Sequence, residues 1–222
     1  MTPGERRPAL LVLAGVNGAG KSSVAGARLR AAGLTYYDPD EATALLRRHG
    51  MAEAEANAAA WRHGHDGLAA AIAARTNYAI ETTLGGRTLP ALIGHACASH
   101  DVTLWFVGLD SPERHIARVA ARVAAGGHAI AEDMIRQRYD SARRNLISLL
   151  PRLHELWVYD NSVEAGDAAH AEPRIVLHCL RGRIKGPPWR QLRHTPDWAK
   201  PLVEAARRLQ PGMGGPTPIR TP

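Results

Sequence analysis

Residues 15–22 read GVNGAGKS, which satisfies every fixed position of the pattern G-x-x-x-x-G-K-[ST]. Glycines at these positions allow successive backbone N–H groups to turn inward toward phosphate oxygens. In such a loop Lys21 reaches the β- and γ-phosphates, and the Ser22 hydroxyl is a ligand of Mg2+. The predicted nucleotide-binding residues are Gly15, Asn17, Gly18, Ala19, Gly20, Lys21, Ser22 and Ser23. The pattern therefore predicts binding of ATP together with magnesium.

The segments on either side of this loop are those that a phosphate-binding loop requires. Residues 9–14 (ALLVLA) form a short apolar run, which predicts a strand buried on both faces. A helix is expected from Lys21 to about Ala32, with Gly33 ending it. The start of that helix would add its positive end to the same anion. This context separates the loop from a chance match.

A carboxylate must take a proton if the bound phosphoryl group is to move to a hydroxyl. The segment YYDPDEA at 36–42 offers Asp38, Asp40 and Glu41. Asp38 and Glu41 have the spacing of a capping box, with proline at the first helical position. Capping does not use Asp40, so Asp40 is the candidate catalytic base. Its alternative role is a favourable interaction with the helix dipole.

A second group of polar residues follows the next predicted strand, in AIETTLGGRT at 79–88. A carboxylate after a buried strand is costly unless it is paired or used, so Glu81 is a candidate for substrate binding. Thr82 and Thr83 flank it on a glycine-rich turn that allows close approach of a ligand. Arg87 could hold an acidic group of the substrate, or it could be a surface arginine at a helix start.

Between residues 118 and 138 the sequence predicts a lid made of helix, Gly-Gly-His turn and helix. Arg118 and Arg122 are four residues apart and share a helix face. Arg136 and Arg138 are two apart and cannot both face one ligand. We favour Lys21, Arg122 and Arg138 as the charge-stabilising groups, with Arg118 and His128 contacting substrate. The alternative for each arginine is an ordinary surface position.

Strands that alternate with helices predict an α/β protein of the three-layer P-loop type, with a mostly parallel central sheet and a helical lid. Strands are expected at 9–14, 35–37, 77–82, 102–109, 156–159 and 174–180. Helices are expected at 21–32, from 38, at 52–74, 88–99, from 112 to about 126, 132–150 and 198–209. Trp61, Trp105 and Trp157 are predicted to be core residues, whereas Trp189 and Trp198 are expected to pack the C-terminal part onto the domain.

The length of 222 residues suits one such domain over residues 1–182. A basic Pro- and Trp-rich extension should follow over 183–210, and residues 211–222 are expected to be disordered. From Pro173 onward ten Lys or Arg accompany two acidic residues. In a chain that is otherwise close to neutral, we interpret this segment as a solvated surface rather than a nucleic-acid site.

Neither a signal peptide nor an apolar run long enough for a membrane span is visible, and membrane association is not expected. The two cysteines, Cys97 and Cys179, lack the spacing of a metal knuckle or a redox pair. Both observations favour a cytoplasmic protein.

The loop GVNGAGKS, the segments DPDE and ETTLGGRT, and the stretch from 118 to 146 together resemble the zeta toxin group of P-loop kinases. The resemblance covers residues 9–180 in the same order. It implies phosphoryl transfer from ATP to a hydroxyl of a UDP-activated amino sugar, typically UDP-N-acetylglucosamine, by a toxin that an antitoxin protein restrains. It also implies that Asp40 is the catalytic base, that Glu81 binds substrate, and that arginines of 118–138 meet the phosphates.

Two other functions remain open from the residues alone. The first is a P-loop kinase that acts on a different hydroxyl, on a nucleotide, an antibiotic or a metabolite. The second is a non-catalytic, ATP-gated binding module that uses the basic C-terminal segment; this function would leave Asp40 and Glu81 without a role.

Overall fold

A single six-stranded sheet organises the chain. The computed structural model describes residues 6–26, 29, 31, 33–162 and 173–210. The strand order is β2-β1-β3-β4-β5-β6; β1 to β4 pair in parallel, and β5 and β6 are antiparallel additions. The strands are β1 (Ala9–Ala14), β2 (Tyr78–Thr82), β3 (Asp101–Gly108), β4 (Glu155–Asp160), β5 (Arg174–Leu180) and β6 (Arg183–Gly186). The predicted α/β class with a mostly parallel sheet is confirmed.

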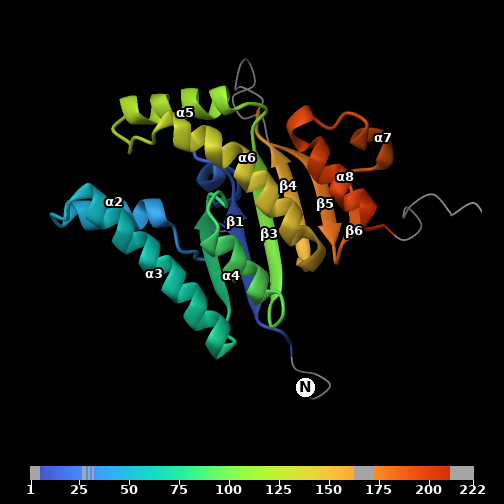
Figure 1. Ribbon diagram of the computed structural model, residues 1–222, viewed down its shortest axis with the longest axis horizontal. Coiled ribbons are helices and arrows are strands. Elements are labelled where there is room, and N and C mark those ends of the chain that lie inside the picture. The colour runs from blue at the N-terminus through green and yellow to red at the C-terminus, as the bar shows by residue number, and fades with distance from the viewer. Residues whose placement is uncertain (1–5, 27–28, 30, 32, 163–172, 211–222) are drawn as a thin grey trace, which may run out of the picture.

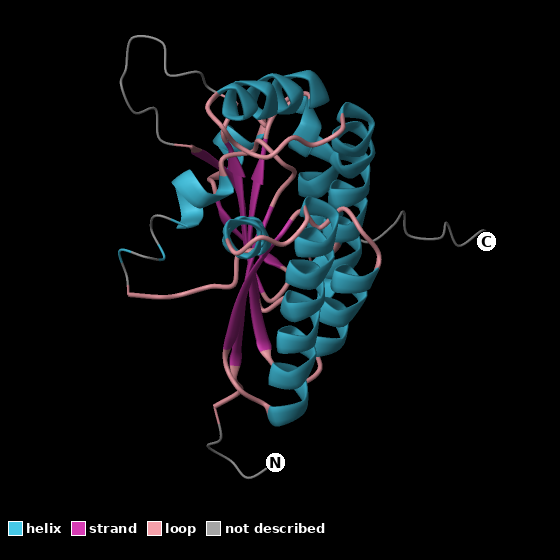
Figure 2. Cartoon of the chain, turned by 90° about the vertical axis from the view of Figure 1, so that its left-hand side faces the viewer, coloured by secondary structure: helices cyan, strands magenta, loops and turns pink. Residues whose placement is uncertain are grey.

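A continuous layer of helices covers one face of this sheet. The helices of this layer are α3 (Glu53–Ala74), α4 (Thr88–Ala96), α6 (Glu132–Leu149) and α8 (Lys200–Arg208). Each packs against the next, and α2 (Pro39–Arg48) packs on α3. Figure 2 shows the sheet nearly edge-on, with long helices along one side. Helix α5 (Pro112–Ala124) lies across the carboxyl end of the parallel strands, where it adjoins α6 (Figure 1).

The apolar pattern explains why β1 lies at the centre of the parallel strands. Its residues Leu10, Val12, Leu13 and Ala14 are at most 1% exposed, as expected for a strand covered on both faces. On α6, Ile135, Ala142, Leu146 and Leu149 recur at helical spacing and lie in the core. These two elements fix the positions of the loop after β1 and of the side chains along α6.

Two predicted elements differ from the structure. The strand expected at 35–37 is reduced to an isolated parallel bridge between Tyr37 and Ile80. The reason is local: Asp38 directly afterwards caps α2, so the chain has no room for a longer pairing. The helix expected from Lys21 begins as a π-helical turn, η1 (Ser22–Gly26); much of its remainder lies outside the described residues.

Residues 183–210 belong to the same sheet and core as the rest of the chain. The predicted boundary after residue 182 falls in the turn between β5 and β6. After β6 come α7 (Trp189–Leu192) and η3 (Asp197–Ala199). The Trp198 indole is 3% exposed, lies near the Phe106 ring, and donates from Nε1 to Asp160 Oδ1 at 3.2 Å. Trp198 therefore packs this segment onto the sheet as predicted, whereas Trp189 is 53% exposed.

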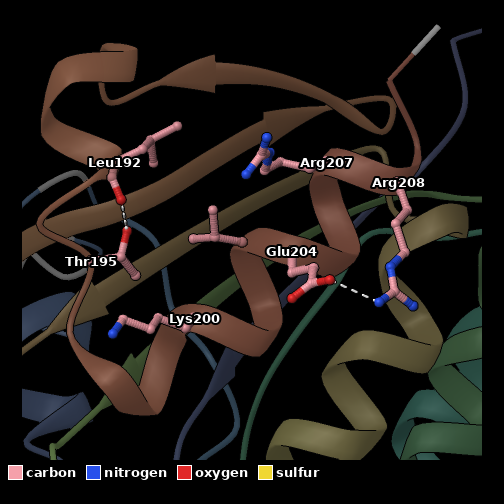
Figure 3. A pocket seen from close by; sticks show the side chains of 7 residues that line it. Leu192, Thr195, Lys200, Glu204, Arg207 and Arg208 are labelled. Carbon is pink, nitrogen blue, oxygen red and sulfur yellow. Dashed lines mark hydrogen bonds and ion pairs between the residues drawn. The ribbon is translucent and has the colours of Figure 1, made fainter. Parts of the chain in front are cut away.

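The segment also carries a pocket of about 430 Å3 that lies outside the phosphate loop. Lys200, Arg207 and Arg208 line it together with Glu204 (Figure 3). Arg208 donates to Glu204 at 2.8 Å, and Arg207 lies over the Trp189 ring at 4.5 Å. These contacts involve Glu204 and two of the three cationic side chains of the pocket wall. The predicted tail at 211–222 lies outside the described residues.

Across the described part of the chain, no helix combines the length and apolarity that crossing a bilayer requires.

Candidate active site

The phosphate loop connects β1 to η1 at the carboxyl end of the sheet. Gly15 has φ +147°, and a Cβ atom there would lie 2.3 Å from the Val107 carbonyl oxygen of the neighbouring strand. Gly18 has φ +80°, and its Cβ would lie 2.7 Å from the His115 carbonyl oxygen. Both positions need glycine because the backbone is left-handed or nearly so and closely packed. The loop is therefore wedged between β3 and α5.

Lys21, Ser22 and Glu81 meet directly beneath this loop. Lys21 Nζ is 3.2 Å from Glu81 Oε1, and the Ser22 hydroxyl donates to Glu81 Oε2 at 3.2 Å. The Lys21 and Glu81 side chains are each 8% exposed. Burial raises the pKa of Glu81, and the Lys21 charge opposes that shift. The acid predicted to bind substrate thus contacts both groups predicted to bind phosphate and metal.

The oxygen atoms at this point fit a hard divalent cation. The Ser22 hydroxyl and the Glu81 carboxylate are both oxygen ligands, and Mg2+ prefers a few such protein ligands beside substrate phosphates.

The start of α2 carries the candidate base. Asp38 is buried and accepts from the backbone N–H of Asp40 at 2.8 Å and of Glu41 at 3.4 Å, which confirms it as the helix cap. Asp40 is half-exposed, and its Oδ2 lies 3.7 Å from Arg122 Nη1. The cap leaves the Asp40 carboxylate directed into the cleft that adjoins Lys21.

Both lid helices hold Asn17 of the phosphate loop. From α6, Arg138 Nη1 donates to Asn17 Oδ1 at 2.7 Å. From α5, His115 Nδ1 lies 2.8 Å from the Asn17 carbonyl oxygen, which can accept only if that ring nitrogen carries the proton. Burial lowers the pKa of His115 to about 4, although the bond to Asn17 opposes the shift. His115 is therefore a neutral donor near pH 7.

Arg138 and Arg136 have different surroundings, as their spacing predicts. Arg138 lines the cleft, and burial lowers the pKa of its guanidinium while the Asp40 charge opposes the shift. Arg136 instead pairs with Glu113 and Glu132 on the exposed side of α6. The structure thus places one arginine of the pair at the phosphate loop.

The turn of the lid rests on the start of α3. Arg122 Nη2 donates to the His128 carbonyl oxygen at 3.1 Å, and His128 Nδ1 is 2.7 Å from Glu53 Oε1, although without hydrogen-bond geometry. Arg122 Nε is buried without a hydrogen-bond partner. Arg122 therefore joins the turn to Asp40.

Arg118 lies on another side of the phosphate loop. Its Nη2 donates to the Asn161 carbonyl oxygen at 2.8 Å, and Asn161 Nδ2 donates to the Ala19 carbonyl oxygen at 2.9 Å. Arg118 thus adjoins the loop from the end of β4. Among the described residues, those that line the cleft next to Asp40 do not include Arg118.

The turn after β2 is fixed by two side chains of α6. Asn145 Nδ2 donates to the carbonyl oxygens of Leu84 at 2.7 Å and of Gly86 at 2.8 Å, and the Ser141 hydroxyl donates to that of Gly85 at 2.8 Å. Leu84 is fully buried with φ +58°, a left-handed conformation that costs a non-glycine residue energy. These contacts hold the turn in this conformation.

Thr82 and Thr83, which precede this turn, accept hydrogen bonds from its backbone. Thr82 Oγ1 accepts from the Leu84 N–H at 3.1 Å, and Thr83 Oγ1 accepts from the Gly85 N–H at 3.4 Å. Both threonines line the cleft, together with the exposed Arg87.

One cleft of about 520 Å3 runs from the phosphate loop to the start of α2, the turn after β2 and the lid. The sequence-predicted residues that line it are Asn17, Lys21, Asp40, Glu81, Thr82, Thr83, Arg87, His128 and Arg138. Trp61 also lines it and is 44% exposed, so the prediction of a core tryptophan is wrong at this position. Trp105 and Trp157 are half-buried.

Sequence reasoning missed His115, Asn145 and Asn161, which hold the phosphate loop and the turn after β2. No local pattern marks His115 or Asn145, because each acts through contacts with a segment that is distant in the sequence. For Asn161 a signal is present: it directly follows an apolar strand at the carboxyl edge of the sheet.

Comparison with known proteins gives a likeness of fold. No protein-family model matches the chain. An uncharacterized protein of Haemophilus influenzae is 36% identical over 70 residues, which are 31% of this chain and 50% of that relative. This chain thus matches half the length of that relative.

Solved structures of the AvrRxo1-ORF1:AvrRxo1-ORF2 complex contain a similar chain. The structure with sulphate ions gives a TM-score of 0.64 at 15% identity, covering 86% of this chain and 64% of that chain. The structure with ATP gives 0.63 at 17% identity, covering 95% and 67%. This chain therefore spans about two thirds of the length of its structural relatives and shares their fold.

Proposed function

We propose that this protein is an ATP-dependent phosphotransferase that acts on a hydroxyl of a small molecule. The observation that carries the proposal is that one cleft brings together Lys21 of the phosphate loop, the carboxylates of Asp40 and Glu81, and the guanidinium of Arg138. A phosphate-binding loop alone suits any nucleotide-binding protein. The adjoining acid and arginine are what a kinase needs and what a binding module does not.

In the proposed reaction the acceptor hydroxyl oxygen attacks the γ-phosphorus of ATP. A new O–P bond forms, the bond from the γ-phosphorus to the β–γ bridging oxygen breaks, and ADP leaves. Asp40 takes the hydroxyl proton as general base. Arg138, held by Asn17, and Lys21 spread the charge of the transferring group.

Magnesium would be held by the Ser22 hydroxyl and, directly or through water, by Glu81. When bound, it neutralises charge on the β- and γ-phosphates. For the triphosphate to enter, Lys21 would exchange the Glu81 carboxylate for phosphate oxygens. Glu81 is therefore expected to change partners between the empty and the loaded protein.

The fine specificity that we propose is a UDP-activated amino sugar such as UDP-N-acetylglucosamine, in a toxin paired with an antitoxin protein. The resemblance of the segments at 15–22, 38–41, 81–88 and 118–146 to the zeta toxin group supports this acceptor. The AvrRxo1 proteins share the fold of this chain and were solved as a two-protein complex, in one case with ATP. This shared fold supports the use of ATP and the presence of a protein partner. A kinase acting on another small-molecule hydroxyl is the alternative within the same chemistry.

Mass spectrometry of a metabolite extract tests this proposal. The extract is incubated with ATP, Mg2+ and the purified protein, and in parallel with the Asp40→Asn variant. We expect one compound to gain the mass of one phosphate with the wild type and not with the variant. A folded protein that binds ATP yet modifies nothing in extracts containing UDP-sugars would overturn the assignment.

A further inference from the structure

Trp61 of α3 exposes a large apolar side chain to water inside the cleft. Its side chain is 44% exposed, although most large apolar side chains of the described core are covered. It lines the same cleft as Lys21 and Asp40. An indole that is exposed inside a polar-rimmed cleft marks a ligand-binding surface more often than an indole on an open part of the protein surface does.

The packing of α3 holds Trp61 on the side of the cleft. Around Trp61 the buried stripe of the helix consists of small residues, Ala56, Ala60 and Gly64. The Tyr37 hydroxyl donates to the Ala60 carbonyl oxygen at 2.6 Å, and a Cβ on Gly64 would lie 2.6 Å from the Tyr37 ring. Trp61 follows Ala60 directly, so it cannot share this face. The fixed helix therefore presents the indole beside the stripe, at the cleft.

A neighbouring ring restricts the indole further. His65, one turn along α3, stacks on it with ring centroids 5.3 Å apart and an interplanar angle of 18°. His65 is itself paired with Asp66 at 2.9 Å. His65 covers one face of the indole and limits its rotation, so a ligand that stacks on the other face costs little side-chain entropy.

The other side chains near Trp61 indicate which ligand it suits. Met134 of α6 lines the same cleft and is 41% exposed, so apolar side chains from two helices face this space. Asn57 lies four residues before Trp61, on the same side of α3, and also lines the cleft. Its amide offers both donors and an acceptor. An aromatic plate with an amide beside it suits a flat ring that has polar edge atoms.

We propose that Trp61 is the stacking platform for a planar heteroaromatic ring of the nucleobase class, carried by the phosphoryl acceptor, and that Asn57 contacts the edge of that ring. The proposal rests on the proposed function, because it names the part of the acceptor that lies away from the reacting hydroxyl. A cleft of about 520 Å3 has the size of sites that hold such ligands.

Calorimetry with defined probes tests the subsite. The phosphate loop is first saturated with Mg2+ and a non-hydrolysable ATP analogue. The 5′-monophosphates of uridine, cytidine, adenosine and guanosine are then titrated, with ribose 5-phosphate as the probe that lacks a ring. We expect at least one nucleotide to bind, and ribose 5-phosphate to bind about tenfold more weakly or worse.

The variants separate stacking from a general loss of structure. Trp61→Ala should weaken nucleotide binding by about tenfold or more, whereas Trp61→Phe, which keeps an aromatic face, should stay within about threefold. Trp189→Ala is the matched control, because Trp189 is also exposed but stacks against Arg207 outside the cleft. Nucleotide binding that is equal in the wild type and Trp61→Ala would overturn the proposal, as would no binding of any of the four.

The same preparations distinguish failure of this inference from failure of the proposed kinase. If Trp61→Ala forms the phosphorylated product at the wild-type rate and KM, the ring subsite is refuted and the kinase stands. If nucleotide binding depends on Trp61 but no extract yields an Asp40-dependent product, the kinase is refuted, and Trp61 stands as a ring-binding site whose ligand is not a phosphoryl acceptor.

Discussion

The Arg138 guanidinium of α6 donates to Oδ1 of Asn17 in the phosphate loop at 2.7 Å. The two residues are separated by 121 positions in the chain, so the contact depends on how the lid lies over the loop. Because His115 of α5 holds the carbonyl oxygen of the same asparagine, both lid helices are attached to the loop at one residue. Loop and lid should therefore act as one unit in catalysis.

The first prediction concerns Arg138. Arg138→Ala should lower the turnover of the acceptor found in the extract by about 10^3-fold, with little change in ATP affinity, because arginines in this role act on the transition state. Arg136→Ala is the control and should keep wild-type turnover, since Arg136 pairs with Glu113 and Glu132 on the surface. Equal turnover in the two variants would contradict the assignment.

Asn17 should act through Arg138. Asn17→Ala is expected to lower turnover in the wild-type background and to have a much smaller effect when Arg138 is already alanine. A double-mutant cycle measures this coupling. Additive effects of the two substitutions would show that the hydrogen bond does not position the arginine.

The second prediction concerns the buried pair of Lys21 and Glu81. Lys21→Met leaves the Glu81 carboxylate buried without its partner, which should lower the free energy of unfolding by about 3 kcal/mol at pH 7. Adding Glu81→Gln should recover most of this loss, because the uncompensated charge is gone. Neither variant should bind ATP. Urea denaturation and calorimetry report the two quantities separately; a double variant no more stable than Lys21→Met would contradict the pairing.

The same pair predicts a dependence on pH. The pKa of Glu81 is raised in the folded protein, so its protonated form is favoured by folding. Stability associated with a raised pKa is present at low pH and is lost as pH rises through the folded value. Loss of the Lys21 charge, which lowers this pKa in the wild type, raises it further in Lys21→Met, so the deficit of the variant should shrink between pH 7 and pH 5 as Glu81 becomes protonated. A deficit that is constant over this range would argue against a buried, charged Glu81.

The third prediction concerns Asn145. Its amide bonds two carbonyl oxygens of the turn at 84–86, so Asn145→Ala should cost about 1–3 kcal/mol of stability. Because that turn carries Thr82 and Thr83 into the cleft, the acceptor KM should rise while ATP affinity stays unchanged. Arg144→Ala, at an exposed neighbouring position of α6, is the control. Loss of ATP affinity in Asn145→Ala would indicate a general disturbance instead.

The fourth prediction concerns His115. Its pKa falls from 6.5 to about 4 on folding, so the unfolded chain binds a proton in this range that the folded protein does not. Stability is therefore complete above pH 6.5 and is lost as pH falls toward 4, by about 3 kcal/mol in total. Urea denaturation between pH 7 and pH 4.5 should show a steeper loss for the wild type than for His115→Gln. Parallel curves would contradict the buried neutral histidine.

The sequence predicts those parts of the fold that depend on neighbours along the chain. The loop at 15–22, the buried strand before it and the Asp38 cap of α2 each rest on residue types within a few positions. The stripe of Ile135, Ala142 and Leu146 follows from helical periodicity. Such features are readable because the local backbone conformation alone fixes which atoms meet.

Contacts between distant segments could not be predicted in this way. His115 meets Asn17 across 98 positions, Asn145 meets Leu84 across 61, and Asn161 meets Ala19 across 142. A polar residue on a helix has the same sequence pattern whether it faces solvent or holds a loop. The partners of these residues follow from the packing of the whole sheet and its helix layer.

Trp61 and β6 show two further reasons why parts of the structure could not be predicted from the sequence. Helix α3 is rich in alanine, so apolar periodicity does not identify its buried face; small residues pack against Tyr37, and the tryptophan stays outside. In β6 the residues Arg183 and Lys185 are exposed. Charges of this kind are common on edge strands, where they discourage pairing with another chain, but in the sequence they resemble a polar loop.

The position of Trp198 determines how short this protein can be made. A Cβ on Gly108 would lie 2.3 Å from the Trp198 ring, and the indole also bonds Asp160 at the end of β4. The tryptophan thus caps the tips of two central strands beside the phosphate loop. A truncated protein that ends at residue 182 would keep each residue assigned to the chemistry. The ends of β3 and β4, which Trp198 covers, would then be exposed to water. We therefore expect the smallest unit that folds and works to extend at least through Trp198.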